Sequence, residues 1–255
     1  MPVIFKSFSE WKLYKKNQLS EKNIGYVPTM GNLHRGHLSL CAASQKQNDV
    51  TVVSIYVNPT QFNDGSDFDC YPRTLKADIE LLKQQQVDYL ILPEQEEVYA
   101  DQFSYQVSEN QIATELEGAF RPGHFTGMLT VVIKLLLGVG AGRAYFGEKD
   151  YQQYLLIKGM VKSFFIECEI IACPIIREAS LLPFSSRNSR LSPNDRQTAD
   201  AVAKIFNQPH TRLEDIRIKL LSLGVEIDYL EERYNRRLMA VKVGTIRLLD
   251  NYAIN

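Results

Sequence analysis

Short apolar runs alternate with amphipathic stretches along the first two thirds of the chain. The apolar runs are rich in Val, Ile, Tyr and Leu, and they predict buried strands at 24–27, 50–57, 88–92, 143–146 and 169–173. Between them, apolar positions recur with a helical period, which predicts helices at 38–47, 75–86, 125–137 and 151–161. Strands that alternate with helices favour an α/β fold, here a Rossmann-like doubly wound parallel sheet.

The pattern changes after about Ser192. Two helical stretches come first and two strand-like stretches follow, at 195–206, 213–223, 225–231 and 238–243. This order predicts a smaller C-terminal α+β domain. We place the boundary between Ile176 and Pro193, and divide the chain into domains of residues 1–183 and 184–255.

The first predicted strand runs into a turn with two histidines, Val27-Pro28-Thr29-Met30-Gly31-Asn32-Leu33-His34-Arg35-Gly36-His37. Gly31 and Gly36 let the backbone approach phosphate oxygens, and a helix that begins near Gly36 directs N–H groups and a partial positive charge at them. His34 and His37 can donate to the same triphosphate. This H-x-G-H element resembles that of nucleotidyltransferases and class I aminoacyl-tRNA synthetases, in which it binds ATP and stabilises the phosphorus centre of an adenylation step.

Composition narrows the possible partners. The chain has 255 residues, 45% hydrophobic and 23% charged, which are ordinary globular values. A net charge of −1 produces no positive electrostatic field that would attract nucleic acid, so we expect no nucleic-acid partner. The N-terminus lacks the pattern of a secretory signal, and the longest apolar stretch, 128–139, is interrupted by Lys134 and too short to span a bilayer. We therefore expect a cytoplasmic protein with no membrane partner.

Further segments match one family in order and composition. They are 54–62 (SIYVNPTQF), 71–74 (YPRT), 117–125 (EGAFRPGHF), 146–153 (FGEKDYQQ), 185–188 (SSRN) and 243–251 (VGTIRLLDN). Together with the H-x-G-H turn they resemble the pantothenate synthetase family, and the resemblance covers nearly the whole chain. It implies a homodimeric ligase that joins pantoate to β-alanine through a pantoyl adenylate, with ATP as co-substrate and Mg²⁺ as the metal.

The resemblance also implies roles for individual residues, with the C-terminal domain covering the active site. The catalytic groups are His34, His37, Lys149 and Arg187. The ATP-binding residues are Met30, Gly31, Asn32, Leu33, His34, Arg35, Gly36, His37, Gly147, Glu148, Lys149, Asp150, Ile176, Phe184, Ser185, Ser186 and Arg187. Asp150 would lie near the metal. Gln61 and Gln153 would bind pantoate, since each amide both donates and accepts, and Asn58, Tyr71 and Arg121 would line the same pocket.

One segment departs from the family. Its usual Asp-Gly-Leu-Ala run is replaced here by Ser180-Leu181-Leu182-Pro183, directly before the Ser-Ser-Arg-Asn element. The Asp-Gly turn becomes bulkier and more apolar, which leaves the geometry of this loop open.

Other interpretations of the same residues stay open. His34, His37 and Cys41 fall at i, i+3 and i+7, a spacing compatible with a soft-metal face. Gly138, Gly140 and Gly142 imitate a dinucleotide fingerprint, although a helix stop explains them better because they follow a helix. The basic run of Arg233, Arg236 and Arg237 is most simply a wet strand edge.

Two other functions remain as alternatives. Another H-x-G-H nucleotidyltransferase would need a basic pocket for a phosphorylated acceptor where this chain has Gln61 and Gln153. A non-catalytic ATP- or pantoate-binding protein is the second alternative, and ATP turnover distinguishes it from an enzyme.

Overall fold

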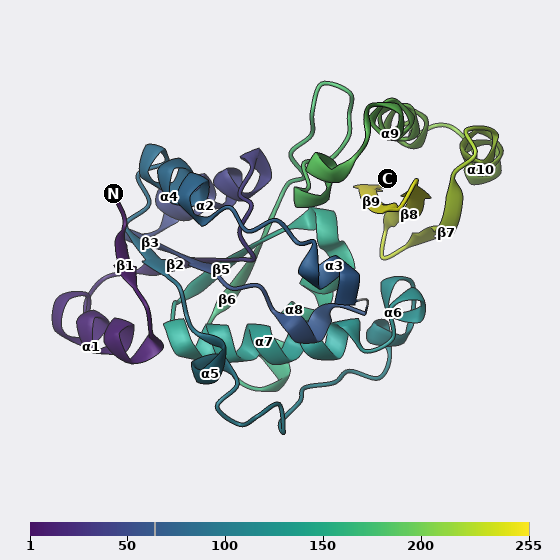
Figure 1. Cartoon of the computed structure of the whole chain (residues 1–255). Helices are drawn as coiled ribbons and strands as arrows, with labels where there is room; N and C mark the ends of the chain where they lie inside the picture. Colours follow the sequence, from purple (N-terminus) through teal and green to yellow (C-terminus); the bar gives the residue numbers. More distant parts are fainter. Residues whose placement is uncertain (64, 255) are drawn as a thin grey trace. The chain divides into compact units, whose positions relative to one another are not determined.

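The computed structural model describes residues 1–63 and 65–254. Contacts divide the chain into two compact units, which Figure 1 colours along the sequence. Unit 1 consists of Met1–Glu148 and Gln152–Cys173, and unit 2 consists of Lys149–Tyr151 and the chain from Pro174 onward. Residues 174–183, which the sequence pattern placed with the first domain, therefore group with unit 2.

Unit 1 is built on a six-stranded parallel sheet in the order β1-β4-β3-β2-β5-β6. The strands are β1 (Val3–Phe5), β2 (Ile24–Thr29), β3 (Val50–Ile55), β4 (Tyr89–Ile91), β5 (Arg143–Gly147) and β6 (Glu169–Cys173). The doubly wound parallel sheet is confirmed. The order of strands reverses between β2 and β5, which is where ligands of such sheets bind.

Apolar residues cover both faces of this sheet. Tyr26 and Val52 point into one apolar cluster, and their neighbours Val27 and Val53 point into another, because side chains alternate along a strand. Helices α1 (Phe8–Gln18), α7 (His124–Val139) and α8 (Tyr151–Ser163) cover the first face, and α2 (Arg35–Gln47) and α4 (Leu75–Gln84) cover the second (Figure 1). The shorter elements are α3 (Gly65–Asp69), α5 (Gln95–Val98), α6 (Glu117–Phe120), η1 (Pro59–Gln61), η2 (Ile112–Thr114) and η3 (Glu148–Asp150).

Two glycines at the C-terminal end of α7, the most apolar helix, have structural roles. α7 ends at Gly140, whose φ of 61° is left-handed, so the predicted helix stop is confirmed. Gly138 lies inside α7, where a Cβ would come within 2.7 Å of the Phe8 ring. Among the described residues, no helix is both long and apolar enough to cross a membrane.

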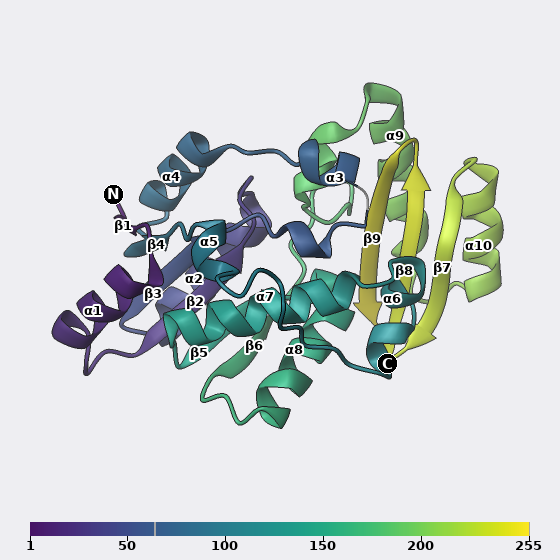
Figure 2. The same ribbon diagram turned by 60° about the horizontal axis from the view of Figure 1, so that its bottom comes forward.

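Unit 2 combines a three-stranded antiparallel sheet with two longer helices, as Figure 2 shows. Its elements are η4 (Ser186–Arg190), α9 (Pro193–Phe206), α10 (Leu213–Ser222), β7 (Glu226–Arg233), β8 (Arg236–Val243) and β9 (Ile246–Ala253). Apolar residues of both helices pack on the sheet and form one core. The smaller α+β domain is confirmed.

The wet strand edge predicted for the basic run is confirmed for Arg233, which is exposed on the edge strand β7, and is wrong for the other two arginines. Arg236 and Arg237 are only 8% and 4% exposed, because β8 is the central strand and β9, which the pattern did not predict, covers its second edge. Arg237 pairs with Glu232 at 2.6 Å and donates to the Tyr252 hydroxyl, so its buried charge is compensated.

The atypical Ser180–Pro183 segment closes a tight hairpin. The amide of Leu181 donates to the Glu178 carbonyl and the amide of Glu178 donates to the Leu182 carbonyl, both at 2.9 Å. Leu182 is buried in the core of unit 2. Leu181 has a φ of 72°, a left-handed conformation that costs a residue with a Cβ about 1–2 kcal/mol. The family's run has its glycine at this position, so the chain keeps the turn with a strained backbone.

We expect Leu181→Gly to raise the free energy of unfolding by about 0.5–1 kcal/mol. Relief of the left-handed strain exceeds the entropy that glycine adds to the unfolded chain, and the Leu181 side chain is 40% exposed and loses little packing. Urea denaturation measures the change. Leu181→Ala is the matched control, because it removes the side chain and keeps the strain; an equal gain in both variants would contradict this explanation.

Candidate active site

The histidine turn lies at the carboxyl edge of unit 1, directly after β2. Gly31 and Asn32 both have positive φ, 80° and 48°. The buried carboxylate of Asp78 on α4 accepts from the amides of Asn32 and Leu33 at 3.0 and 2.8 Å. The Thr74 hydroxyl donates to the same carboxylate at 3.1 Å. Asp78 therefore fixes the turn that carries the histidines.

Asp78→Asn is expected to lower the free energy of unfolding by about 2 kcal/mol, because an amide NH2 replaces one acceptor oxygen and faces a backbone N–H. The affinity for ATP should fall with it, because the turn loosens. Urea denaturation and ATP titration measure both effects. Glu80→Gln on the exposed side of α4 is the control and should change neither; unchanged stability in Asp78→Asn would contradict the role of this carboxylate.

The two histidines stack at the start of α2. Their ring centroids are 4.0 Å apart, with 26° between the ring planes. α2 begins at Arg35 with His34 at the N-cap position, and its first turn has no acidic residue. The positive end of the helix dipole thus lies beside the imidazoles, which suits an anionic ligand. The predicted helix start next to Gly36 is confirmed.

The neighbouring strand brings the first predicted pantoate residues to this edge. Asn58 follows β3, is 1% exposed, and donates to the Gln61 side-chain oxygen at 3.1 Å. The Tyr99 hydroxyl donates to the Asn58 amide oxygen at 2.6 Å, while burial raises the pKa of Tyr99 and keeps it a donor. The Gln61 amide nitrogen in turn lies 3.4 Å from the sulfur of Met30. Met30, Asn58 and Gln61 therefore form one contact chain between the two strand ends.

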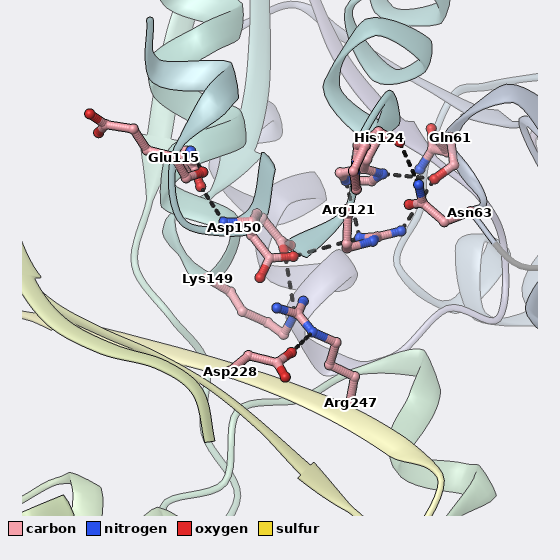
Figure 3. Close-up of polar contacts among 12 residues, drawn as sticks. Gln61, Asn63, Glu115, Arg121, His124, Lys149, Asp150, Asp228 and Arg247 are labelled. Atoms are coloured by element: carbon pink, nitrogen blue, oxygen red, sulfur yellow. Dashed lines mark hydrogen bonds and ion pairs between the residues drawn. The ribbon is translucent and has the colours of Figure 1, made fainter. Parts of the chain in front are cut away.

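Two residues fix the backbone of Gln61, as Figure 3 shows. Arg121 donates to the Gln61 carbonyl at 3.2 Å, and the His124 ring nitrogen Nδ1 lies 2.7 Å from the same oxygen. Arg121 also lies 3.7 Å from the buried carboxylate of Glu117. Arg121 was predicted to line the pocket; His124 was missed because a lone histidine at a helix start carries no pattern of its own.

The two adjacent glutamines on α8 differ in their surroundings. Gln152 is 3% exposed, accepts from the Glu117 amide and donates to the carbonyls of Ile112 and Glu115. Gln153 is half-buried, and no described residue is a hydrogen-bond partner of its side chain. Gln153 thus has an amide available for a ligand, whereas Gln152 holds the loop before α6. The predicted pocket residue Tyr71 is 5% exposed and packs edge-on against Phe62.

The β5 end carries the next predicted group. Gly147 ends β5, the strand beside β2, and Glu148 follows it half-buried within unit 1. Because β3, β2 and β5 are adjacent and parallel, the residues after all three strands lie at one edge of the sheet. The histidine turn and Asn58–Gln61 therefore lie at the same edge of this unit.

Unit 2 gathers the cationic residues. Lys149 lies 3.2 Å from the carboxylate of Asp150. Lys149, Ser185 and Arg187 line one pocket together with Asn188 and Arg247, and Figure 3 shows Arg247 held by Asp228 at 2.5 Å. Of the three positive side chains around this pocket, Lys149 and Arg247 each pair with a carboxylate, and Arg187 is the third.

The loop that bears the Ser-Ser-Arg element is held from within unit 2. The Phe184 amide donates to the Ile176 carbonyl at 3.0 Å, so these two predicted ATP contacts lie side by side. The Ser185 hydroxyl accepts from the Arg187 amide, and Ser186 is 9% exposed. Asn188 donates to Glu178 and to the Pro183 carbonyl, both at 3.0 Å. Asn188, Glu178 and Arg247 were missed because their partners are distant in sequence or lie in the atypical hairpin.

The position of Cys41 does not support a soft-metal site formed by His34, His37 and Cys41 at α2. Its side chain is 1% exposed within the apolar cluster under α2. The same burial raises the pKa of the Cys41 thiol to about 12. In the part of the chain that the structure describes, no group of three His, Cys, Asp or Glu has metal-binding geometry.

A parallel sheet with stacked H-x-G-H histidines at its strand-order reversal places the chain among α/β nucleotide-binding proteins. The chain belongs to the pantoate-beta-alanine ligase family, whose sequence profile matches residues 3–253. It is 51% identical to the pantothenate synthetase of Legionella pneumophila (strain Lens) over 98% of this chain and 99% of that protein.

Solved structures agree with this placement. The pantoate-beta-alanine ligase of Francisella tularensis, complexed with beta-gamma ATP and beta-alanine, superposes with a TM-score of 0.94 at 42% identity, over 99% of this chain and 98% of that one. The pantothenate synthetase of Thermus thermophilus superposes with a TM-score of 0.89 at 34% identity, over 99% of each chain.

Proposed function

We propose that this chain uses ATP to condense pantoate with β-alanine and releases pantothenate, AMP and pyrophosphate. The observation that carries the proposal is the full-length family match together with the H-x-G-H pair, whose rings stack 4.0 Å apart at the sheet edge. The family member from Francisella tularensis was solved with an ATP species and β-alanine, which are two of the three proposed substrates.

In the first step, the pantoate carboxylate attacks the α-phosphorus of ATP, and pyrophosphate leaves. The carboxylate is ionised near neutral pH, so the attack needs no strong base. The protein must instead offset repulsion between two anions and stabilise charge on the phosphoryl oxygens. We assign this role to His34, His37, Lys149 and Arg187.

The remaining ATP contacts follow from the positions of the predicted residues. The start of α2 at Arg35 and Gly36 offers backbone N–H groups and the helix dipole, while the amides of Asn32 and Leu33 already donate to Asp78. Gly147, Glu148, Ile176 and Phe184 would contact the nucleotide, and the hydroxyls of Ser185 and Ser186 would donate to its phosphates without adding charge.

Pantoate carries two hydroxyls and a carboxylate, which suits neutral amides. Gln153, with no described partner, would both donate and accept, and Gln61 would add a second amide held in place by Asn58. Arg121 and Tyr71 would complete this pocket. The alternative nucleotidyltransferase would need a cationic acceptor pocket here, whereas the charge of Arg121 is offset by Glu117 and the other proposed groups are neutral.

The available oxygen donors fit Mg²⁺. Asp150 has a carboxylate side chain that is 43% exposed, and Mg²⁺ usually takes one or two carboxylates and completes its shell with phosphates and water. Asp150 would hold the ion, with Glu148 beside it in the sequence. When bound, Mg²⁺ neutralises part of the triphosphate charge.

In the second step, the amine of β-alanine attacks the acyl carbon of the adenylate, a C–N bond forms and AMP leaves. The amine nitrogen loses a proton to solvent as the amide forms. His37 is the proposed proton donor of the overall reaction, since an unperturbed imidazole has a pKa near neutral pH. We further propose that the protein is a homodimer, as the family resemblance implies, and sedimentation velocity of the purified protein tests this. We also propose a cytoplasmic location.

The direct test measures pyrophosphate and AMP release from ATP and Mg²⁺, with and without each organic substrate, and identifies products by mass. The proposal expects pyrophosphate that requires pantoate, and AMP with pantothenate only after β-alanine is added. ATP binding without pantoate-dependent release would favour a non-catalytic binding protein. Release that requires a phosphorylated acceptor would favour another nucleotidyltransferase.

A further inference from the structure

The closing strand of the chain contacts the segment that carries Lys149. Asn251 lies on β9, is 2% exposed, and donates from its side-chain nitrogen to the Lys149 backbone carbonyl at 2.9 Å. Lys149 sits in the three-residue helix η3, which is too short to hold itself rigid through internal hydrogen bonds. η3 links the end of β5 to the start of α8, and Asn251 adds a support from β9 at its middle residue.

The orientation of the Asn251 amide is determined by its neighbours. Its oxygen accepts from Arg236 Nε at 2.5 Å, and an arginine can only donate. Its NH2 group must therefore face the Lys149 carbonyl, which can only accept. Arg236 is itself fixed, because it is 8% exposed and its guanidinium lies 4.4 Å from the centre of the Tyr151 ring. Both flanks of Lys149–Tyr151 are thus held by adjacent strands of one sheet.

Asp250, the residue before Asn251, holds the hairpin that leads into the Ser-Ser-Arg element. Asp250 is 4% exposed and pairs with both terminal nitrogens of Arg177 at 2.7 Å. Arg177 also donates to the Asn251 carbonyl at 3.0 Å and to the Leu181 carbonyl at 2.9 Å. Arg177 and Pro183 face each other across the hairpin that leads into the Ser-Ser-Arg element. One end of β9 therefore supports both Lys149 and the hairpin.

We propose that Asn251 is a positioning residue for adenylate formation, which acts by fixing the backbone of Lys149. The inference rests on the proposed function, because it needs Lys149 to stabilise the transferring phosphoryl group. A displacement of about 1 Å at a catalytic group is enough to cost about a hundredfold in rate. The amide at position 251 thus places the ammonium group without touching substrate.

A double-mutant cycle tests the proposal. Asn251→Ala and Lys149→Ala are made singly and together, and pyrophosphate release is followed in single turnover with enzyme in excess, so that slow variants stay measurable. Asn251→Ala alone should slow the step about tenfold to a hundredfold. In the Lys149→Ala background the same change should cost less than about twofold, since the group it positions is gone. An equal loss in both backgrounds would overturn the proposal.

Two further variants separate positioning from folding. Asn251→Asp keeps the size of the side chain and its pairing with Arg236, but turns an acceptor toward the Lys149 carbonyl; circular dichroism should show it folded, and it should lose as much rate as Asn251→Ala. Gln208→Ala removes another unit 2 amide, one that donates to the Lys204 carbonyl and accepts from Lys219, and should leave the rate unchanged. Full activity in a folded Asn251→Asp would refute the proposal.

The two hypotheses fail in different ways. Absence of pantoate-dependent pyrophosphate from the wild-type protein would refute the proposed function. An active wild type whose Asn251 and Lys149 effects multiply independently would refute only the inference.

Discussion

Replacing His37 by alanine is expected to lower the rate of pantoyl-adenylate formation about a hundredfold or more, while the fold stays intact. The His37 ring stacks on His34 at the first turn of α2, where the helix dipole already favours anions. The Nδ1 atoms of both rings are buried, so we expect His37 to donate to a ligand through Nε2. Single-turnover formation of pyrophosphate from ATP and pantoate measures this step without product release.

Matched variants separate donation from stacking. His37→Gln places a neutral amide donor near the position of Nε2, so part of the rate should return if His37 acts as a hydrogen-bond donor. His210→Ala, at an exposed position of unit 2, controls for loss of a histidine as such and should be silent. A single-turnover rate within a few fold of wild type in His37→Ala would remove His37 from the mechanism.

Local patterns were enough for the sheet and the histidine turn. Each buried strand of unit 1 reads as an apolar run because helices cover both faces, and the residues that follow adjacent strands must meet at one edge. β1 was missed because it is an edge strand of only three residues. β9 is also an edge strand and was not predicted, so Arg236 and Arg237 were wrongly placed on an open edge.

The sequence pattern does not predict the residues that support the site, because their role depends on partners far along the chain. Asp78 resembles any carboxylate in an amphipathic helix until α4 is seen to bring it to the amides of Asn32 and Leu33. Asn251 gives no sign in the sequence of its contact with Lys149. Long-range hydrogen bonds leave no periodic signal, so the pattern predicts where side chains converge and not which ones hold them there.

The second large effect is expected at Gln153. Replacing it by alanine should weaken pantoate binding about tenfold to a hundredfold, the loss of two hydrogen bonds in a shielded pocket, and leave the affinity for ATP nearly unchanged. Isothermal titration of each ligand into the variant measures both affinities. An equal loss for pantoate and ATP would contradict a dedicated pantoate contact.

Its neighbour provides the matched control. Gln152 has the same side chain, but all of its hydrogen bonds go to Glu117, Ile112 and Glu115 within the protein. Gln152→Ala should therefore lower the free energy of unfolding by about 2 kcal/mol, since buried backbone groups lose their partner, and it has no reason to select one ligand over the other. If the pair behaved alike, the half-buried amide of Gln153 would be structural too, and Gln61 alone would have to distinguish pantoate.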